Sequence, residues 1–440
     1  MRKQVIAILA ALSLATVLAG CGGTPDSGSS SGGDQPAGEV SGKISFLHKW
    51  TDDQYAYIYA DLVNEYLAAH PGVEIDMQAV GDQPIKDQLR VLTSADELPD
   101  IFFAWPGDFA KKFIRGGFAA DLTEYLAGDW GDAFADSALG AYSYDGKNYG
   151  VPINQNAKVF AYSKSAFEKA GISVPTTYEE LLATCEPLKA AGYNPIAFGN
   201  QYGWPAIHYI TQLNAEYVPA DVRNADYNPA GGAFTDPGYE QALTTFKDLI
   251  DKCSKTGSNG ISHETAQAEL TTGKAGMQYV EVLEFVSLDN TESVPAEFVD
   301  DWDFFAFPPI AGAAGTPGAI TGAPDGFLVN AKSQNMALAI DFLKFLTSKS
   351  SEGAIAKAFQ WPPAVDGAAE DAGLNEKTVR ATDLMGSAVE TAVWLDTETH
   401  AEVAQEYLAG VEKLLANEMT PAQVMESVRA TAKRVAEENS

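Results

Sequence analysis

Segments with strand-like and helix-like hydrophobic patterns alternate through the first part of the folded chain, which we expect to begin at Lys43. Three short apolar or alternating segments have the character of strands: 43–47, 73–77 and 101–104. Two segments with helical spacing lie between them: 58–66, where Ile58, Leu62 and Tyr66 recur every four residues, and 83–92. This β-α-β-α-β order predicts a parallel sheet.

The centre of the chain changes pattern several times within a short distance. A turn at Asp145-Gly146 precedes an apolar run that ends at Pro152, and the polar cluster Asn154-Gln155-Asn156 follows. A strand-like alternation covers residues 159–163. The helix after it is predicted to end at Gly171, because glycine readily adopts the left-handed conformation that ends many helices.

The rest of the chain continues in the same mixed style. Further strands are predicted at 196–198, 302–307 and 326–329, and further helices at 239–252, 335–346, 403–415 and 421–436. The chain has 440 residues, which is too long for one ordinary hydrophobic core. We therefore expect an α/β protein with more than one domain.

The central segment resembles a known family. It contains GKNYGVP at 146–152, then YSK at 162–164, and then FEKAGISVPTTYEEL at 167–181. This succession is similar to family 1 extracellular solute-binding proteins, the carbohydrate-capturing subunits of ABC importers, and weaker matches extend over residues 43–436. The resemblance implies a two-lobed, type II periplasmic-binding-protein-like α/β fold. Each lobe would be a mainly parallel sheet flanked by helices, with a ligand cleft between the lobes.

The resemblance also implies where the lobes divide, because in this family the central segment carries the chain from the first lobe to the second. We expect the first lobe to comprise residues 43–153 plus 325–366. The second lobe would comprise residues 154–324 plus 367–440.

The N-terminus has the pattern of an exported lipoprotein. Arg2 and Lys3 precede an apolar run at 5–18, which predicts a signal peptide over residues 1–20. The run ends in Leu18-Ala19-Gly20-Cys21, which looks like a lipobox, so Cys21 is the expected site of lipidation. Residues 21–42 are rich in Gly and Ser and predict a flexible linker. We expect a lipid anchor on the extracytoplasmic face of the cell membrane; a Gram-positive surface suits it best, and a periplasmic lipoprotein remains open.

The charge excludes several partners. Sixty acidic against 29 basic residues give a net charge of −31, which argues against nucleic acid and anionic lipid as partners. The five histidines lack metal-ligand spacing, and His263-Glu264 lacks the second histidine of a zinc helix. The sequence also contains no phosphate loop or dinucleotide fingerprint. We expect no metal and no cofactor, and a monomer whose partners are a carbohydrate and the permease subunits of an ABC transporter.

Two cysteines besides Cys21 fall on apolar stripes of predicted helices. Cys185 lies at helical spacing from Leu181 and Leu188, and Cys253 from Ile250. Both are predicted to be buried. The sequence leaves open whether they form a disulfide, because it does not show their distance.

Sugars have apolar ring faces and hydroxyl edges, so a sugar site needs aromatic platforms and planar polar groups. Five tryptophans at predicted strand ends and loops are candidate platforms, of which two or three are expected in the site: Trp50, Trp105, Trp204, Trp361 and Trp394. Trp130 and Trp302 are interpreted as structural. Candidate polar groups are Asp52, Gln83, Asp108, Asn154, Asn156 and Asp325, with at least one side chain of the 154–156 cluster facing the cleft.

Glu281 marks a departure from the family. After Met277 the family usually has Gly-x-Trp, whereas this chain has Val280-Glu281-Val282. The missing platform leaves the subclass of sugar open, and Glu281 also fits a cationic or amino-sugar ligand. Two other functions remain as alternatives: a cell-surface glycoside hydrolase or lyase, for which acidic pairs are available, and an adhesive lipoprotein without transport. Solute binding without catalysis is the favoured hypothesis.

Overall fold

The computed structural model describes residues 41–51, 53–228, 232–370 and 372–438. Residues 39–440 form one compact unit. The predicted signal peptide, the lipidation site Cys21 and nearly all of the predicted linker lie outside the described residues, as does the candidate Asp52. Within the described ranges, no helix combines the length and apolarity that a membrane span requires.

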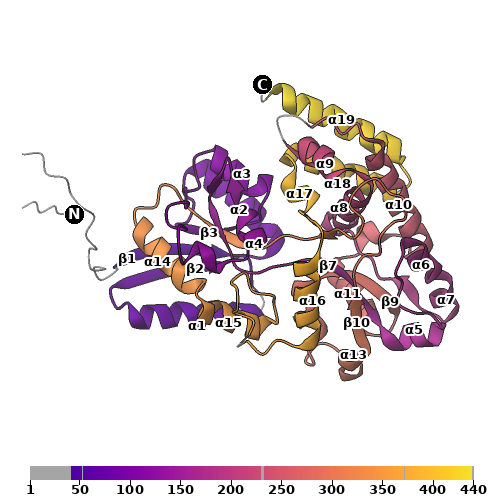
Figure 1. Ribbon diagram of the computed structural model, residues 1–440, viewed down its shortest axis with the longest axis horizontal. Helices are drawn as coiled ribbons and strands as arrows, with labels where there is room; N and C mark the ends of the chain where they lie inside the picture. Colours follow the sequence, from indigo (N-terminus) through magenta and orange to yellow (C-terminus); the bar gives the residue numbers. More distant parts are fainter. Residues whose placement is uncertain (1–40, 52, 229–231, 371, 439–440) are drawn as a thin grey trace, which may run out of the picture. The chain divides into compact units, whose positions relative to one another are not determined.

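A five-stranded sheet organises the first lobe, with the order β2-β1-β3-β12-β6. Figure 1 labels three of its strands, β1, β2 and β3. Its strands are β1 (Gly42–His48), β2 (Val73–Ala79), β3 (Ile101–Ala104), β6 (Gly150–Pro152) and β12 (Gly326–Val329). β1 pairs in parallel with β2 and β3, as the β-α-β-α-β pattern predicts. β12 lies antiparallel to both β3 and β6.

By strand direction the first sheet is mainly parallel, as predicted, because four of its five strands run the same way and β12 alone is reversed. In the first lobe β12 returns from the second lobe and enters the sheet at the end where β1 and β3 finish, so it runs against them. The four-stranded sheet of the second lobe has the order β10-β7-β9-β8, in which β8 and β9 form the one parallel pair of neighbouring strands and β7 runs against the other three. Both sheets are mixed, because strands far apart in sequence complete them.

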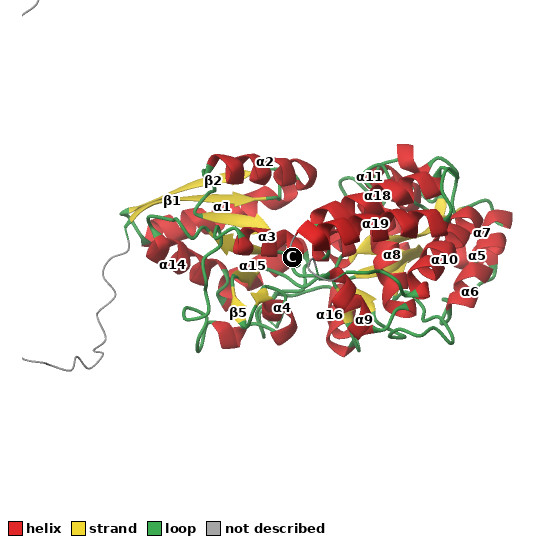
Figure 2. Ribbon diagram, turned by 90° about the horizontal axis from the view of Figure 1, so that it is seen from above, coloured by secondary structure: helices red, strands yellow, loops and turns green. Residues whose placement is uncertain are grey.

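Helices cover both faces of the first sheet. On one side lie α1 (Asp53–Ala69), α14 (Met336–Leu346) and α15 (Lys349–Phe359); on the other lie α2 (Asp82–Ala95) and α3 (Asp108–Arg115) (Figures 1 and 2). The apolar faces of these helices meet the sheet in one core cluster, in which the rings of Phe46 and Phe327 lie 5.0 Å apart. The short elements of this lobe are η1 (Gly131–Ala133), α4 (Asp136–Gly140), β4 (Ser143–Tyr144) and β5 (Lys147–Asn148).

The second lobe is built around β7 (Lys158–Ser163), β8 (Asn194–Ile196), β9 (Ala275–Glu281) and β10 (Trp302–Phe305), with a second core cluster that extends from Phe160 to Val435. Its helices are α5 (Lys164–Ala170), α6 (Tyr178–Ala183), α7 (Cys185–Ala190), α8 (Trp204–Tyr217), α9 (Ala220–Tyr227), α10 (Pro237–Cys253), α11 (His263–Thr271), α12 (Phe285–Leu288), α13 (Ala296–Asp301), α16 (Glu376–Ser387), α17 (Leu395–Glu398), α18 (Ala401–Leu415) and α19 (Pro421–Glu438). Smaller elements are η2 (Ser258–Gly260), η3 (Val282–Glu284), β11 (Ile320–Thr321) and β13 (Thr391–Ala392).

In the central segment the structure confirms the predicted helix end and the predicted turn. Gly171 ends α5 with a φ of 68°, as predicted. The Asp145-Gly146 turn joins β4 to β5, and both residues have positive φ. The strand predicted at 196–198 lies earlier, at β8.

A disulfide joins Cys185 at the start of α7 to Cys253 at the end of α10. Both cysteines are buried, as predicted. The bond ties together two helices of the second lobe that are 68 positions apart in sequence.

Three segments connect the lobes and lie beside one another. The backbone N–H of Ile153 donates to the carbonyl of Asp325 at 2.8 Å, and that of Gln155 donates to Pro362 at 2.8 Å. The Gln155 side chain adds a 3.0 Å hydrogen bond to the Pro363 carbonyl. The exact positions at which the lobes divide, 153/154, 324/325 and 366/367, stay a prediction.

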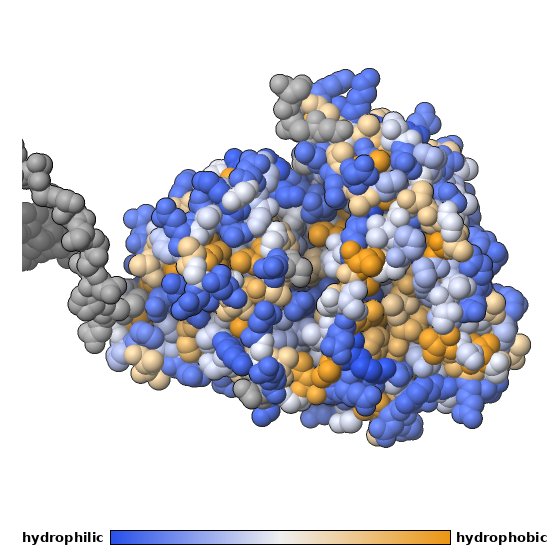
Figure 3. Space-filling model, viewed as in Figure 1, coloured by the Kyte–Doolittle hydropathy of each residue, from blue (hydrophilic) through white to orange (hydrophobic). Residues whose placement is uncertain are grey.

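The visible face of the molecule is mostly hydrophilic, with apolar residues scattered over it (Figure 3). Scattered apolar residues of this kind are normal for a protein surface.

Candidate functional site

Residues from both lobes surround a cavity of about 190 Å³, which we call the tryptophan cavity. The first lobe contributes Lys49, Asp82, Lys86, Trp105 and Asp325. The second lobe contributes Asn156, Trp204, His208, His263, Glu264, Glu281, Glu284, Trp394, Asp396 and Thr397.

The sheet topology places the first-lobe residues there. β1 and β3 are parallel, so their carboxyl ends meet at one edge of the sheet, where ligands bind in open α/β folds. Lys49 follows β1 directly and Trp105 follows β3. Asp325 immediately precedes β12, which starts at the same edge because it runs antiparallel to β3.

Three tryptophans line the cavity. Trp105 is buried and belongs to the first lobe, whereas Trp204, half-buried, and Trp394, buried, belong to the second. The Trp394 ring stacks on His208 with centroids 4.1 Å apart. The Trp204 ring lies 4.7 Å from His263. The cavity therefore has flat apolar surfaces on both lobes.

Lys49 joins two carboxylates on the first-lobe side. Its ammonium lies 3.1 Å from Asp325 and 3.5 Å from Asp82. Burial disfavours the charged lysine, but these carboxylates outweigh it and raise the pKa of Lys49. Burial also raises the pKa of Asp325, although Lys49 and Asn154 hydrogen-bond to it. Asn154 holds the backbone as well, because its Oδ1 accepts from the Asp325 N–H at 2.9 Å.

A second ionic cluster lies on the second-lobe side. Lys158 begins β7 and is the cross-strand partner of Glu281 at the end of β9, so their side chains meet. The buried Lys158 ammonium lies 3.8 Å from Glu281 and 3.9 Å from Glu284. His263 Nε2 lies 2.6 Å from Glu284, and Asn156 donates to Glu281 at 2.7 Å.

The pKa values of the two glutamates in this cluster shift in opposite directions. Burial raises the pKa of Glu281, and the nearby Glu284 carboxylate adds to this, against the opposing charge of Lys158. Burial would also raise the pKa of Glu284, but the charges of His263 and Lys158 outweigh it and lower that pKa to about 2. Glu284 is therefore the firmly ionised member of the pair.

Several buried polar atoms at the cavity have no hydrogen-bond partner among the described residues: Asn156 Oδ1, His208 Nδ1 and Asp396 Oδ1. The buried His48 Nε2, outside this cavity, also lacks a hydrogen-bond partner among the described residues. Burial lowers the pKa of His208 far below its usual value, and the nearby lysines add to the effect, so this ring is neutral.

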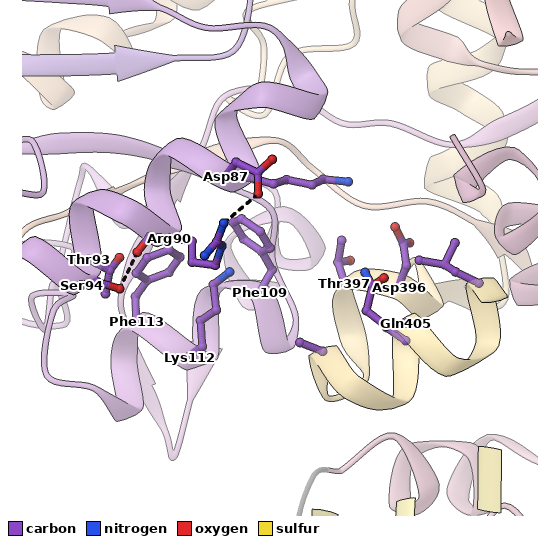
Figure 4. A pocket seen from close by; sticks show the side chains of 14 residues that line it. Asp87, Arg90, Thr93, Ser94, Phe109, Lys112, Phe113, Asp396, Thr397 and Gln405 are labelled. Atoms are coloured by element: carbon purple, nitrogen blue, oxygen red, sulfur yellow. Dashed lines mark hydrogen bonds and ion pairs between the residues drawn. The ribbon is translucent and has the colours of Figure 1, made fainter. Parts of the chain in front are cut away.

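Two further cavities adjoin the tryptophan cavity. One, of about 360 Å³, is shared by Trp204, Gln83 and Gln201. The other, of about 550 Å³, lies between α2 and α3 of the first lobe and α17 and α18 of the second (Figure 4). Lys86 and Asp396 line all three cavities. The three cavities are therefore neighbours, and these two side chains form part of the wall of each.

The larger neighbour differs in chemistry from the tryptophan cavity. Figure 4 shows Phe109 and Phe113 on one wall, with Asp396 and Gln405 on the facing helices. The Lys112 ammonium lies 3.6 Å from the centre of the Phe109 ring. The lobes touch near this cavity, where Lys111 forms a 2.9 Å ion pair with Glu398 of α17.

Gly107 allows this close approach of the lobes. Its φ is +78°, and a Cβ at this position would lie 2.6 Å from the Thr397 carbonyl. A larger residue would therefore meet α17 of the second lobe.

Half of the candidate residues line the tryptophan cavity: Trp105, Asn156, Trp204, Glu281, Asp325 and Trp394. Gln83 lines an adjoining cavity, and the Asn154 side chain donates a hydrogen bond to the Asp325 carboxylate. The remaining described candidates lie elsewhere. Trp50 is packed in the core with its ring stacked 4.9 Å from Tyr59. Trp361 donates through Nε1 to the Leu283 carbonyl at 2.9 Å, which places it between the lobes.

Asp108 forms an ion pair within its own helix and does not line the tryptophan cavity. It begins α3, is 3% exposed, and lies 2.6 Å from Arg115 at the end of the same helix. The two structural tryptophans behave as predicted, since Trp302 is fully buried and Trp130 donates to Thr347 at 2.9 Å.

Sequence reasoning missed several charged residues at the cavity: Lys49, Lys86, His263, Glu284 and Asp396. Signals existed for two of them, because Lys49 directly follows a predicted strand and Asp396 comes two residues after a candidate tryptophan. His263 was considered only as part of a zinc motif. Among the described residues, no group of His, Cys, Asp and Glu has the arrangement of a metal site.

Comparison with known proteins agrees with this architecture. Residues 49–353, more than half of the chain, match the family described as bacterial extracellular solute-binding protein. The Diacetylchitobiose binding protein DasA of Streptomyces coelicolor is 25% identical over 364 residues, covering 81% of each chain. A putative binding protein of Brucella abortus is 27% identical over 297 residues, covering 66% of this chain and 68% of its own.

A solved structure titled "Chitin oligosaccharide binding protein" superposes with a TM-score of 0.82 at 22% identity, covering 90% of this chain and 99% of its own. This likeness shows the fold. Together with the family match it confirms the two-lobed periplasmic-binding-protein-like fold.

The family match identifies the chain as a solute-binding receptor rather than an enzyme. The chain belongs to the bacterial extracellular solute-binding proteins.

Proposed function

We propose that this protein captures a sugar in the tryptophan cavity and delivers it to the membrane permease of an ABC importer. The observation that carries the proposal is the meeting of Trp105 from one lobe with Trp204 and Trp394 from the other around carboxylate and amide groups. Indole faces suit the apolar faces of sugar rings, and the polar groups suit their hydroxyls. The family match and the names of DasA and the chitin oligosaccharide binding protein support a carbohydrate ligand.

Capture would take place by closure of the lobes. The residues that line the cavity come from both lobes, so the complete site exists only when the lobes are together. The three connecting segments, held side by side by the hydrogen bonds of Ile153 and Gln155, suit a hinge. The proposed division at 153/154, 324/325 and 366/367 places the hinge axis through them.

The cavities leave room for more than one sugar ring. The tryptophan cavity alone, at about 190 Å³, is smaller than the roughly 300–1,000 Å³ typical of small-molecule sites. The two neighbouring cavities, which share Lys86 and Asp396 with it, would give further rings a place to bind. The proposed ligand is therefore a mono- or oligosaccharide whose first ring occupies the tryptophan cavity.

The N-terminal pattern completes the proposal. A signal peptide over residues 1–20 would export the chain, and acylation of Cys21 would anchor it on the extracytoplasmic face of the cell membrane. The Gly- and Ser-rich residues 21–42 would let a monomeric receptor reach its permease.

Thermal unfolding of the full chain in detergent, against a panel of sugars and oligosaccharides with amino acids and peptides for comparison, tests the proposal. A ligand at 100 times its Kd adds about 2.7 kcal/mol of stability, so one class of sugar should raise the Tm by several degrees. Trp204→Ala should abolish most of this rise, because it removes a platform of the cavity. Trp130→Ala is the matched control, since Trp130 lies in the first core away from the cavity.

A Tm rise with amino acids or peptides alone contradicts the sugar proposal. An unchanged sugar response in Trp204→Ala contradicts the placement of the site.

A further inference from the structure

The charges around the tryptophan cavity are unequal. Two lysines line it, Lys49 and Lys86. The carboxylates that line it are Asp82, Glu264, Glu281, Glu284, Asp325 and Asp396. Lys158 behind the cavity and His263 at its wall supply at most two more positive charges. Even with both counted, the carboxylates outnumber the cations, in a chain whose own net charge is −31.

Most of these carboxylates are already compensated. Lys49 lies within ion-pair distance of Asp325 and Asp82, and Lys158 within the same reach of Glu281 and Glu284. Two members of the set have no such partner among the described residues. Glu264 is exposed to solvent at the start of α11, whereas Asp396 is half-buried on α17.

Asp396 is therefore the uncompensated carboxylate within the site. Its Oδ1 has neither solvent contact nor a hydrogen-bond partner among the described residues. Burial raises the pKa of Asp396, and the nearby charge of Lys86 does not reverse this. A partly buried carboxylate that lacks an ion-pair partner is unfavourable, so a positive charge beside it would be bound with a gain.

The aromatic walls favour a cation as well. Indole faces attract ammonium groups, and the cavity already uses this attraction: Lys86 lies 4.8 Å from the centre of the Trp105 ring and Lys158 lies 4.9 Å from that of Trp204. The third tryptophan, Trp394, has no ammonium over its ring among the described residues. Its ring stacks on the neutral His208, and it lies two residues before Asp396.

We propose that the captured sugar carries a positively charged amino group, which binds against the Asp396 carboxylate beside Trp394. This inference rests on the proposed function and names the class of sugar. The negative charge of the whole chain would also attract such a ligand over a longer range. Lys49 does not oppose it strongly, because Asp325 and Asp82 already neutralise that ammonium.

Matched sugars that differ only in one substituent test the proposal. Calorimetric titration of the full chain in detergent would compare the β1,4-linked disaccharides of glucosamine, N-acetylglucosamine and glucose, and the monosaccharide pairs glucosamine with glucose and galactosamine with galactose. In at least one set, the free amine should bind about tenfold or more tightly than its neutral counterparts. The preference should weaken as salt is added, because screening reduces the attraction.

Two variants locate the charge that causes the preference. Asp396→Asn keeps the shape of the side chain and removes its charge, so the amine preference should fall to about threefold or less. Asp87→Asn makes the same chemical change on a carboxylate outside the tryptophan cavity and should keep the preference. Thermal unfolding of both variants establishes that they are folded.

Three results overturn the inference: neutral sugars that bind as tightly as their amines, an amine preference that survives Asp396→Asn, or no binding of any amino sugar. The proposed function fails separately, because it fails only when neutral sugars and oligosaccharides also leave the protein without a response.

Discussion

The Lys49 ammonium and the Asp325 carboxylate lie 3.1 Å apart, although 276 positions separate them in sequence. Lys49 follows β1 and Asp325 precedes β12, so the pair forms only after the chain has returned from the second lobe. Asp325 is 3% exposed. The pair therefore combines a structural role in the first lobe with a place in the wall of the tryptophan cavity.

Lys49→Met should destabilise the protein by about 3–5 kcal/mol at neutral pH, because it leaves Asp325 buried without a cation. Urea unfolding measures the change. The loss should shrink below about pH 4, where the carboxyl group is protonated even in the unfolded chain. Lys49→Arg keeps the positive charge and serves as the control. A loss of less than about 1 kcal/mol in Lys49→Met would show that the pair contributes little.

Glu284 should make the protein sensitive to acid. Its pKa is lowered to about 2 in the folded state, whereas an unfolded glutamate has a pKa of about 4.3. Its ionised form therefore stabilises the fold above about pH 4.3, and this contribution is lost as the pH falls toward 2. In Glu284→Gln, the free energy of unfolding should decline less steeply between these two values. Equal slopes in the two proteins contradict the assignment.

Glu352 should change the stability with pH in the opposite sense, by destabilising the fold at high pH. This residue of α15 is fully buried, and apart from a hydrogen bond from the Ala364 N–H its environment does not favour a charge. Burial raises its pKa well above the usual value. The Glu352 carboxyl stays protonated in the folded state at pH values where an unfolded glutamate, with a pKa of about 4.3, is already ionised. Its contribution to the free energy of unfolding is therefore present in acid and lost as pH rises.

Glu352→Gln should consequently raise the Tm at pH 8 and change it little at pH 4. The neutral amide occupies the same space without the cost of a buried charge. Scanning calorimetry at the two pH values measures the difference. A lower Tm at pH 8 would mean that the carboxylate is needed in its charged form.

The disulfide should stabilise the second lobe. Removing the Cys185–Cys253 bond, which closes a loop of 68 positions, should cost about 2–5 kcal/mol, because the unfolded chain gains freedom. The double variant Cys185→Ala, Cys253→Ala should show this loss in urea unfolding. A reducing agent should lower the Tm of the natural protein and leave that of the variant unchanged. A Tm that is insensitive to the reducing agent contradicts the prediction, provided that thiol titration confirms reduction.

Local sequence signals predicted most strands of the two large sheets and several of the longer helices, because caps, turns and periodicity act over a few residues. β3 and β12 have the predicted bounds, since each is a short apolar run. The identity of the reversed strands was missed, because it depends on β12 and β7 pairing with distant strands. No local pattern carries that information.

The site was predictable only in part, for a related reason. Trp50 and Trp105 both follow a strand of the same sheet edge, yet Trp50 packs into the core and Trp105 lines the cavity. At the end of β1 it is Lys49, one residue earlier, that lines the cavity. Neighbouring side chains on an extended segment point to opposite sides, so the choice between them depends on the packing of α1, which the strand pattern alone does not reveal.

The position of β12 between β3 and β6 also has a consequence for the order of folding. The first lobe cannot complete its sheet until residues 326–329 have been synthesised, because β12 occupies a central place in it. The second lobe is interrupted in the same way, since α18 and α19 join its core from the end of the chain. Such contacts between distant residues slow folding. The chain therefore acquires its native structure late, after nearly all of it is available.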